Sequence, residues 1–86
     1  MGKRFFGQPV ADRAPSATIV TGYDEEHLAI YSDLLEAEAE GAEWDEAALL
    51  VLHIDPIREP ERARRVWESH LTRAKWISGR GQGGLR

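Results

Sequence analysis

The stretch PERARRVWESHLTRAKWIS, residues Pro60–Ser78, decides the fold. On a helix of about 3.6 residues per turn, one side of this stretch is apolar, which predicts a face that packs in a core. Pro60 suits the first position of a helix, and Gly79 suits the residue just past its end. We therefore expect a helix from Pro60 to Ser78. Its apolar face comprises Ala63, Val66, Trp67, His70, Leu71, Ala74 and Ile77.

The other side of this helix carries a stripe of arginines with an indole near its end. Three interpretations are open: a solvated face whose Arg and Glu side chains pair, a surface that binds a protein, or a recognition helix that contacts DNA from the second half of a helix-turn-helix pair. An indole on the polar side is typical of a hot-spot anchor in a protein interface. We call this set the arginine stripe; it comprises Arg62, Arg65, Ser69, Arg73 and Trp76, and Arg58 joins it in the DNA interpretation.

A second helix is expected from Asp24 to Glu40. Thr21 and Asp24 have the spacing of a capping box, and Gly41 favours termination. The end of this helix is rich in carboxylates, which oppose the negative end of the helix dipole. Such a face is either solvated or a docking face for a basic partner. The candidate partner-binding residues here, which we call the acidic stripe, are Asp33, Glu36 and Glu40.

Between these two helices we expect a short helix from Asp45 to His53. It is apolar on nearly all sides, which predicts that it is buried and forms the centre of the core. Pro56 prevents it from continuing. Residues 16–21 contain strand-forming residues but have no strand to pair with, so an extended segment is expected. The sequence thus predicts an all-α, three-helix bundle of helix-turn-helix type at residues 16–78, a flexible arm at 1–15 and a flexible glycine-rich tail at 79–86.

Charge is divided unevenly along the chain, although the net charge is only −4. Residues 1–13 have three basic residues and one acidic residue (+2), residues 14–57 have eleven acidic residues and no Lys or Arg (−11), and residues 58–86 have eight basic and three acidic residues (+5). A block of this negative charge repels DNA at long range, because non-specific DNA binding is mostly electrostatic. Basic protein partners fit the pattern better.

Catalytic signatures are missing from the sequence. It has no phosphate-binding loop, nucleophile elbow or HExxH motif, and no cysteine. His70 lies on the apolar face of the long helix, which favours a packed, hydrogen-bonded histidine, and Asp55 before Pro56 favours a turn cap. No segment has the length of a membrane span or a signal peptide. We expect a non-enzymatic, cytoplasmic protein without cofactor or metal.

Four strings, in this order, resemble a proteobacterial domain family: SATIVTG (Ser16–Gly22), TGYDEEHL (Thr21–Leu28), VLHIDP (Val51–Pro56) and RARRVWESHLTRAKW (Arg62–Trp76). The family includes FseA-type activators of conjugative-element transfer and the small stand-alone QseM-type antiactivators of mesorhizobial symbiosis islands, and the similarity covers roughly residues 5–78. The resemblance implies a variant helix-turn-helix fold. Family members usually continue with a Gly-Tyr-Arg segment, whereas this chain has Gly79-Arg80-Gly81, which leaves a final helix open.

The resemblance also implies a function. A QseM-type protein binds a TraR-type (LuxR-class) quorum-sensing regulator and an FseA-type activator, and so represses excision and conjugative transfer of an integrative element. We therefore expect an antiactivator that is a monomer when free and does not bind DNA or a membrane. The alternative is a small DNA-binding regulator. The candidate partner-binding residues are Asp33, Glu36, Glu40, Arg62, Arg65, Arg73 and Trp76.

Overall fold

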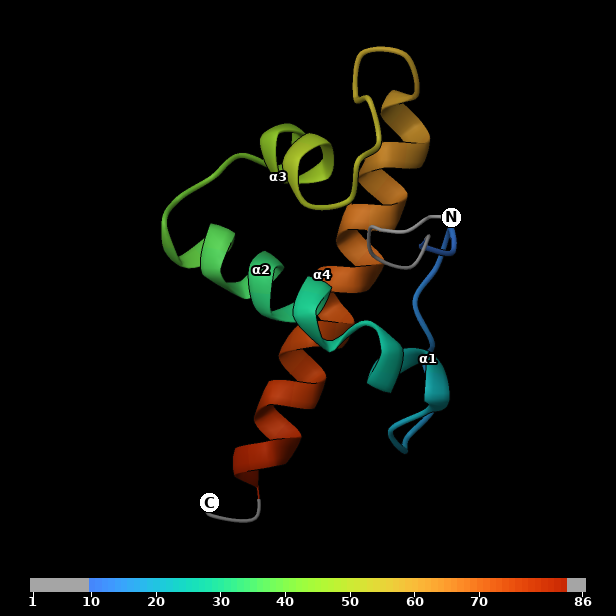
Figure 1. Ribbon diagram of the computed structural model, residues 1–86, viewed down its shortest axis with the longest axis vertical. Helices are drawn as coiled ribbons and strands as arrows, with labels where there is room; N and C mark the ends of the chain where they lie inside the picture. Colours follow the sequence, from blue (N-terminus) through green and yellow to red (C-terminus); the bar gives the residue numbers. More distant parts are fainter. Residues whose placement is uncertain (1–9, 84–86) are drawn as a thin grey trace, which may run out of the picture.

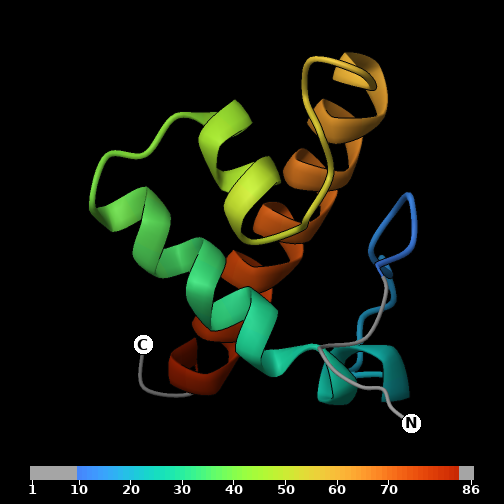
Figure 2. The ribbon, with the colours of Figure 1, turned by 45° about the horizontal axis from the view of Figure 1, so that its top comes forward.

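The computed structural model describes residues 10–83, with side chains described up to residue 79. This part of the chain is a small all-α bundle, which confirms the predicted fold class (Figure 1). The long helix α4 forms its axis, and α2 and α3 cover one side of α4 while the segment before α1 lies on the other side (Figures 1 and 2). The helices are α1 (Gly22–Glu26), α2 (Leu28–Ala39), α3 (Trp44–Leu50) and α4 (Pro60–Gly83).

The core forms where α2, α3 and the chain after α3 meet the apolar face of α4. Ala63, Val66 and His70 are fully buried, and Ala74 is 1% exposed, so the face predicted from the periodicity of this helix is the one that packs. Small residues at the contact let helices approach closely, and α3 contributes two alanines there. The buried cluster comprises Leu34, Ala47, Ala48, Leu52, Ile54, Ala63, Val66 and Leu71.

The single helix predicted from Asp24 to Glu40 is instead two helices that meet at His27. The His27 ring stacks on Tyr23 with centroids 3.9 Å apart, and its Nδ1 donates to the Tyr23 carbonyl at 2.7 Å. That carbonyl is the one that the backbone N–H of His27 would use in a continuous helix. The His27 N–H bonds the Asp24 carbonyl instead, at 3.1 Å. The side chain has therefore taken the acceptor and interrupted the helix.

The predicted capping signals are confirmed at both ends of this pair of helices. The Thr21 hydroxyl accepts from Asp24 N at 3.2 Å, and the Asp24 carboxylate accepts from Thr21 N at 2.8 Å. At the other end Gly41 has a φ of 83°. Its N–H bonds the Glu38 carbonyl and the Ala42 N–H bonds the Ala37 carbonyl, both at 3.0 Å, which is the Schellman motif.

The prediction that the short helix is buried on most sides is wrong. Helix α3 ends at Leu50, before the predicted His53; it buries Ala47 and Ala48 in the core, and Trp44 packs against the core while partly exposed. Its leucines, Leu49 and Leu50, are 49% and 64% exposed. A helix of two turns that packs on one neighbour has only one buried side. The apolar residues that complete the core, Leu52 and Ile54, come after the helix has ended.

The long helix does not stop at Ser78 as predicted, because α4 continues to Gly83. Gly79 has no positive φ and makes no terminating turn. Glycine permits a left-handed terminus but does not impose one, and in a helix it costs only about 1 kcal/mol relative to alanine. The helical residues 79–83 thus differ from the flexible tail expected there; residues 84–86 lie outside the described part of the chain.

The segment before α1 has no regular secondary structure and contacts both α1 and α4, which differs from the loose arm expected for residues 1–15. Val10 packs against the core cluster, the Ala14 N–H donates to Ser69 Oγ at 3.0 Å, and the Ala11 N–H donates to the Tyr23 hydroxyl at 2.9 Å. Residues 1–9, including Phe5 and Phe6, lie outside the described residues. None of the helices within residues 10–83 combines the length and apolar character needed to cross a bilayer.

Candidate partner-binding site

A buried ion pair between Asp24 and Arg73 holds the segment before α1 against α4. Arg73 Nε donates to Asp24 Oδ1 at 3.0 Å and Arg73 Nη2 to Oδ2 at 2.7 Å. The same guanidinium donates to the carbonyls of Ala17 at 2.6 Å and Ile19 at 2.8 Å. The two side chains are only 4% (Arg73) and 0% (Asp24) exposed. One arginine therefore fixes residues 17–19, α1 and α4 together.

The prediction that Arg73 belongs to the exposed arginine stripe is therefore wrong. Arg73 follows Val66 by seven residues, two helical turns, and so lies on the same side of α4 as this fully buried residue. Its charge is compensated by Asp24, whose pKa lies well below its usual range because of the hydrogen bonds from Arg73. Tyr31 also donates to Asp24 Oδ1, at 2.7 Å, and burial together with this bond raises the pKa of the phenol.

The predicted packed histidine is confirmed at His70. Its Nδ1 lies 2.8 Å from the Val66 carbonyl, which can only accept, so Nδ1 carries the proton. Its Nε2 therefore accepts from the Tyr23 hydroxyl, at 2.6 Å. The side chain is fully buried, and this burial lowers the pKa of the imidazole. Asp55 likewise caps the predicted turn, since its Oδ1 accepts from Ile57 N at 2.9 Å.

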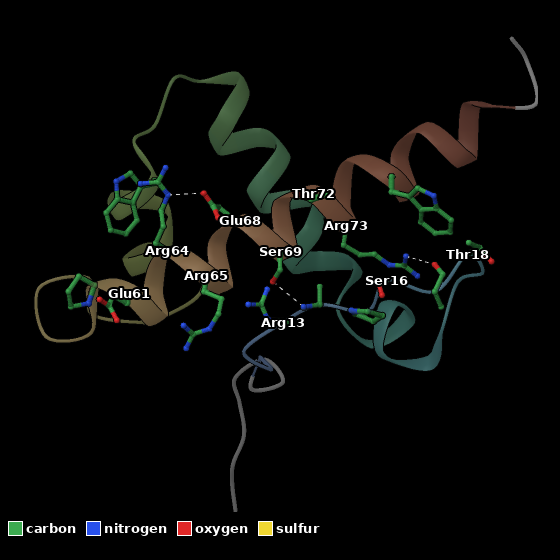
Figure 3. Close-up of a pocket in the computed structure, with 16 residues that line it drawn as sticks. Arg13, Ser16, Thr18, Glu61, Arg64, Arg65, Glu68, Ser69, Thr72 and Arg73 are labelled. Atoms are coloured by element: carbon green, nitrogen blue, oxygen red, sulfur yellow. Dashed lines mark hydrogen bonds and ion pairs between the residues drawn. The ribbon is translucent and has the colours of Figure 1, made fainter.

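An open groove of about 1020 Å³, which we call the α4 groove, runs along α4 beside residues 13–18 (Figure 3). The Arg64 guanidinium carbon lies 5.1 Å from the Trp44 ring centroid, and that of Arg73 lies 4.1 Å from the Trp76 ring centroid. Because nine residues of helix span about 13 Å, the two indoles are far apart along the groove. Charged residues that line it are Arg13, Glu61, Arg64, Arg65, Glu68 and Arg73.

The remaining arginines of the predicted stripe make ion pairs at the surface. Arg62 Nε lies 2.9 Å from Asp12 Oδ1, and Arg65 Nη2 lies 3.3 Å from Asp12 Oδ2. Hydrogen bonds from Arg62, and then from Arg65, lower the pKa of the Asp12 carboxyl. Arg64, just between them in sequence, pairs with Glu68 at 3.2 Å. The arginine stripe is thus divided into one buried cation and two cations that share a carboxylate of the N-terminal segment.

The acidic stripe lies on the side of α2 opposite to α4. Tyr31 and Leu34 point into the core, and the positions three and four residues apart on the opposite side are Asp33, Glu36 and Glu40. All three are exposed, and within the described residues none of them makes an ion pair. On the same helix Glu38 faces α4 and pairs with Lys75 at 2.8 Å. The structure therefore brings together the three predicted acidic residues on one face, separate from Arg62, Arg65 and Trp76.

Sequence reasoning missed the N-terminal side of the groove. Residues 13–15 were expected to belong to a flexible arm and residues 16–18 to an extended segment, and Trp44 was not assigned to any site. The sequence did contain a signal for the burial of Arg73, namely its position two helical turns after Val66. The ion pair between Asp12 and Arg62 had only a weak signal, because an exposed carboxylate 50 residues away has no periodic relation to the arginine. Long-range ion pairs of this kind have no local sequence signature.

The described residues contain no group of three or more His, Asp or Glu side chains placed to hold one metal ion. The two candidate surfaces are thus an acidic face on α2 and a groove on α4 with an indole near each end. No protein-family model matches this sequence, and no curated protein is similar enough to match it.

Proposed function

We propose that this protein is a cytoplasmic antiactivator that binds a basic, DNA-binding transcriptional activator and keeps it from its promoter. The observation that carries the proposal is the acidic stripe, which presents three exposed carboxylates on α2 without ion pairs in the described residues. DNA-binding domains expose Lys and Arg for phosphate contacts, so an acidic face is complementary to the same surface that DNA uses.

The charge distribution around the stripe supports a cationic partner. Nine of the eleven acidic residues between positions 14 and 57 are exposed, and this half of the chain has no Lys or Arg. Exposed carboxylates act together at distances up to the Debye length, about 8 Å at physiological salt, and steer a cationic protein toward the surface. The resemblance to QseM-type antiactivators names the partner class: a TraR-type quorum-sensing regulator and an FseA-type activator.

The α4 groove supplies a second surface for the same partner class. Trp76 lies on α4 in the part of the groove beyond Arg73, and aromatic side chains in partly closed grooves are frequent hot spots. The two surfaces would recognise different features of a partner. The acidic stripe would bind positive charge, and the α4 groove would bind a side chain of suitable shape. Binding of the activator through either surface would repress excision and conjugative transfer.

Direct DNA binding by α4 receives less support. Of the cations that such a helix would use, Arg73 is buried, and Arg62 and Arg65 are paired with Asp12. Contact with phosphates would require these pairs to break. The connection between α3 and α4 covers residues 51–59, whereas a helix-turn-helix pair is usually joined by about three or four residues.

The test is a binding titration of the purified protein with a TraR-type regulator and an FseA-type activator, by calorimetry and by co-purification. The triple variant Asp33→Lys/Glu36→Lys/Glu40→Lys should weaken the complex at least about tenfold, because each lost exposed pair is worth up to about 1 kcal/mol and each is replaced by a repulsion. Glu25→Lys is the matched control: it is exposed on α1, belongs to neither the acidic stripe nor the α4 groove, and changes the charge by the same amount per site.

Each outcome has a meaning. Weakening by the triple variant and by Glu36→Lys alone, but not by Glu25→Lys, supports the acidic stripe. Weakening by Trp76→Ala alone supports an antiactivator that binds through the α4 groove and removes the stripe from the account. A complex that neither set of variants weakens contradicts both surfaces, and the absence of any complex, combined with salt-dependent binding to promoter DNA, contradicts the proposed function.

A further inference from the structure

Helix α3 exposes two large apolar side chains that its composition predicted to be buried. Leu49 is 49% exposed and Leu50 is 64% exposed, whereas Ala47 and Ala48 are 4% and 0% exposed. The helix therefore presents its small residues to α4 and its leucines to solvent. Single exposed leucines are common on protein surfaces, but adjacent ones on the outer side of a helix form a small apolar patch.

Carboxylates border this patch on its N-terminal side. Asp45 precedes Leu49 by four residues and Glu46 precedes Leu50 by four residues, so each acid lies one turn before a leucine on the same side of the helix. Both acids are exposed, and neither pairs with a basic side chain within the described residues. Among the residues that the structure describes, the Asp45 carboxylate accepts only a local bond, from Glu46 N at 2.8 Å. We call these four residues the leucine face.

We propose that the leucine face docks a cationic amphipathic helix of the partner protein, whose apolar side chains cover Leu49 and Leu50 and whose Lys or Arg side chains pair with Asp45 and Glu46. This inference rests on the proposed function and adds to it the element that anchors the partner. The acidic stripe attracts a basic protein but buries little apolar surface, and burial of apolar surface is the term that usually dominates stable association.

The charge of the leucine face selects this occupant over two others. A second copy of the chain would bring its own Asp45 and Glu46 against the same carboxylates, and like charges at close range oppose pairing. The apolar face of α4, the other amphipathic helix of the copy, is already buried in the core. A membrane surface rich in anionic lipid would also be repelled, because such surfaces attract basic segments.

The experiment uses the full chain and a synthetic helical peptide of leucines and lysines, with the leucines spaced to form one apolar side. Binding is followed by calorimetry, and by the intrinsic tryptophan fluorescence, to which Trp44, directly before Asp45 in α3, contributes with Trp67 and Trp76. Wild-type protein should bind the peptide, and an otherwise identical leucine and glutamate peptide should bind at least about tenfold more weakly. Leu49→Ser/Leu50→Ser should reduce affinity for the cationic peptide at least about tenfold.

The matched control is Ile57→Ser, because Ile57 is 89% exposed but lies in the connection before α4 and not on α3. It should leave peptide affinity unchanged. Circular dichroism checks that each variant is folded, and the single variant Leu50→Ser, at the more exposed position, replaces the double variant if the latter is not. Equal affinity of wild type and the leucine variants for the cationic peptide would overturn the proposal, as would equal affinity for the glutamate peptide.

Failure of this inference is separable from failure of the proposed function. If the activator complex is weakened by the acidic-stripe variant but not by Leu49→Ser/Leu50→Ser, the antiactivator function stands and the leucine face is not its anchor. If the cationic peptide binds through the leucines but no activator binds, the leucine face is a docking site and the proposed function is wrong.

Discussion

Replacement of Arg73 by alanine should destabilise the protein more than any other removal of a positive charge in residues 10–79. The substitution leaves the fully buried Asp24 carboxylate without its two bonds from the guanidinium, and it leaves the carbonyls of Ala17 and Ile19 without donors. Loss of one partner of a buried ion pair costs about 3–5 kcal/mol. A chain of 86 residues has a total stability of about 4–13 kcal/mol, so this loss is a large fraction of the total and approaches all of it at the lower end of the range.

The assay is urea unfolding followed by circular dichroism. With a urea dependence of about 1 kcal/mol per molar for a small domain, the midpoint should fall by about 3 M or more. Lys75→Ala, which removes an exposed pair with Glu38, is the control and should cost less than about 1 kcal/mol. In the double variant Asp24→Ala/Arg73→Ala the loss should be smaller than the sum of the single losses. An effect of Arg73→Ala no larger than that of Lys75→Ala would refute the buried pair.

Three further predictions concern His70, Tyr31 and Gly79. First, burial lowers the pKa of His70 in the folded state, so the unfolded chain takes up a proton at higher pH than the folded chain, and the stability present above about pH 6.5 should be lost as pH falls, by at most about 1.4 kcal/mol per pH unit. Urea midpoints between about pH 7.5 and pH 5 measure this loss. His70→Gln should remove the pH dependence, whereas His53→Gln, at an exposed position, should not. Second, Tyr31→Phe removes a buried hydrogen bond to a carboxylate and should cost about 1.5–3 kcal/mol in the same assay, and a loss below about 0.5 kcal/mol would count against the 2.7 Å contact. Third, Gly79→Ala should raise the free energy of unfolding by up to about 1 kcal/mol, and with it the thermal midpoint. The reason is that α4 continues through this residue without a positive φ and with open space at the Cβ position. A lower midpoint would indicate that the helix ends there.

The parts of the fold that the sequence predicts well are those specified by local patterns. The apolar period of residues 60–78 placed Ala63, Val66 and His70 in the core, and Gly41 ends α2 as expected, through a Schellman motif. Such signals depend on residues within one or two turns of each other, so a single sequence contains all the information that they need. The capping box of Thr21 and Asp24 belongs to the same class.

The parts that could not be predicted depend on contacts between residues distant in the sequence. Asp24 has the spacing of a cap and is one, but its pairing with Arg73 joins residues 49 positions apart and has no local pattern. The break at His27 follows from a side chain that competes for a backbone carbonyl, which helix propensity does not describe. The exposure of Leu49 and Leu50 follows from the number of neighbours that α3 packs against, which composition does not give.

The candidate site was predicted only in part, because local spacing gives the side of a helix but not the contacts made there. Asp33, Glu36 and Glu40 share a face because their spacing is helical, and they remain predicted partner-binding residues. The arginine stripe was also inferred from helical spacing, yet Arg73 is buried and Asp12 pairs with Arg62 and Arg65. Helical spacing assigns a side chain to a side of the helix, whereas the contacts on that side depend on the rest of the chain.

The most direct test of the proposed antiactivator function is a competition between this protein and promoter DNA for a TraR-type regulator. The regulator is bound to labelled operator DNA, the purified protein is added, and the fluorescence anisotropy of the DNA is measured. We expect release of the DNA at near-stoichiometric protein and no binding of the protein to DNA alone. At least about tenfold more of the Asp33→Lys/Glu36→Lys/Glu40→Lys variant should be needed for the same release. Unchanged anisotropy at a large excess of protein, or a salt-dependent increase with the protein alone, would contradict the proposed function.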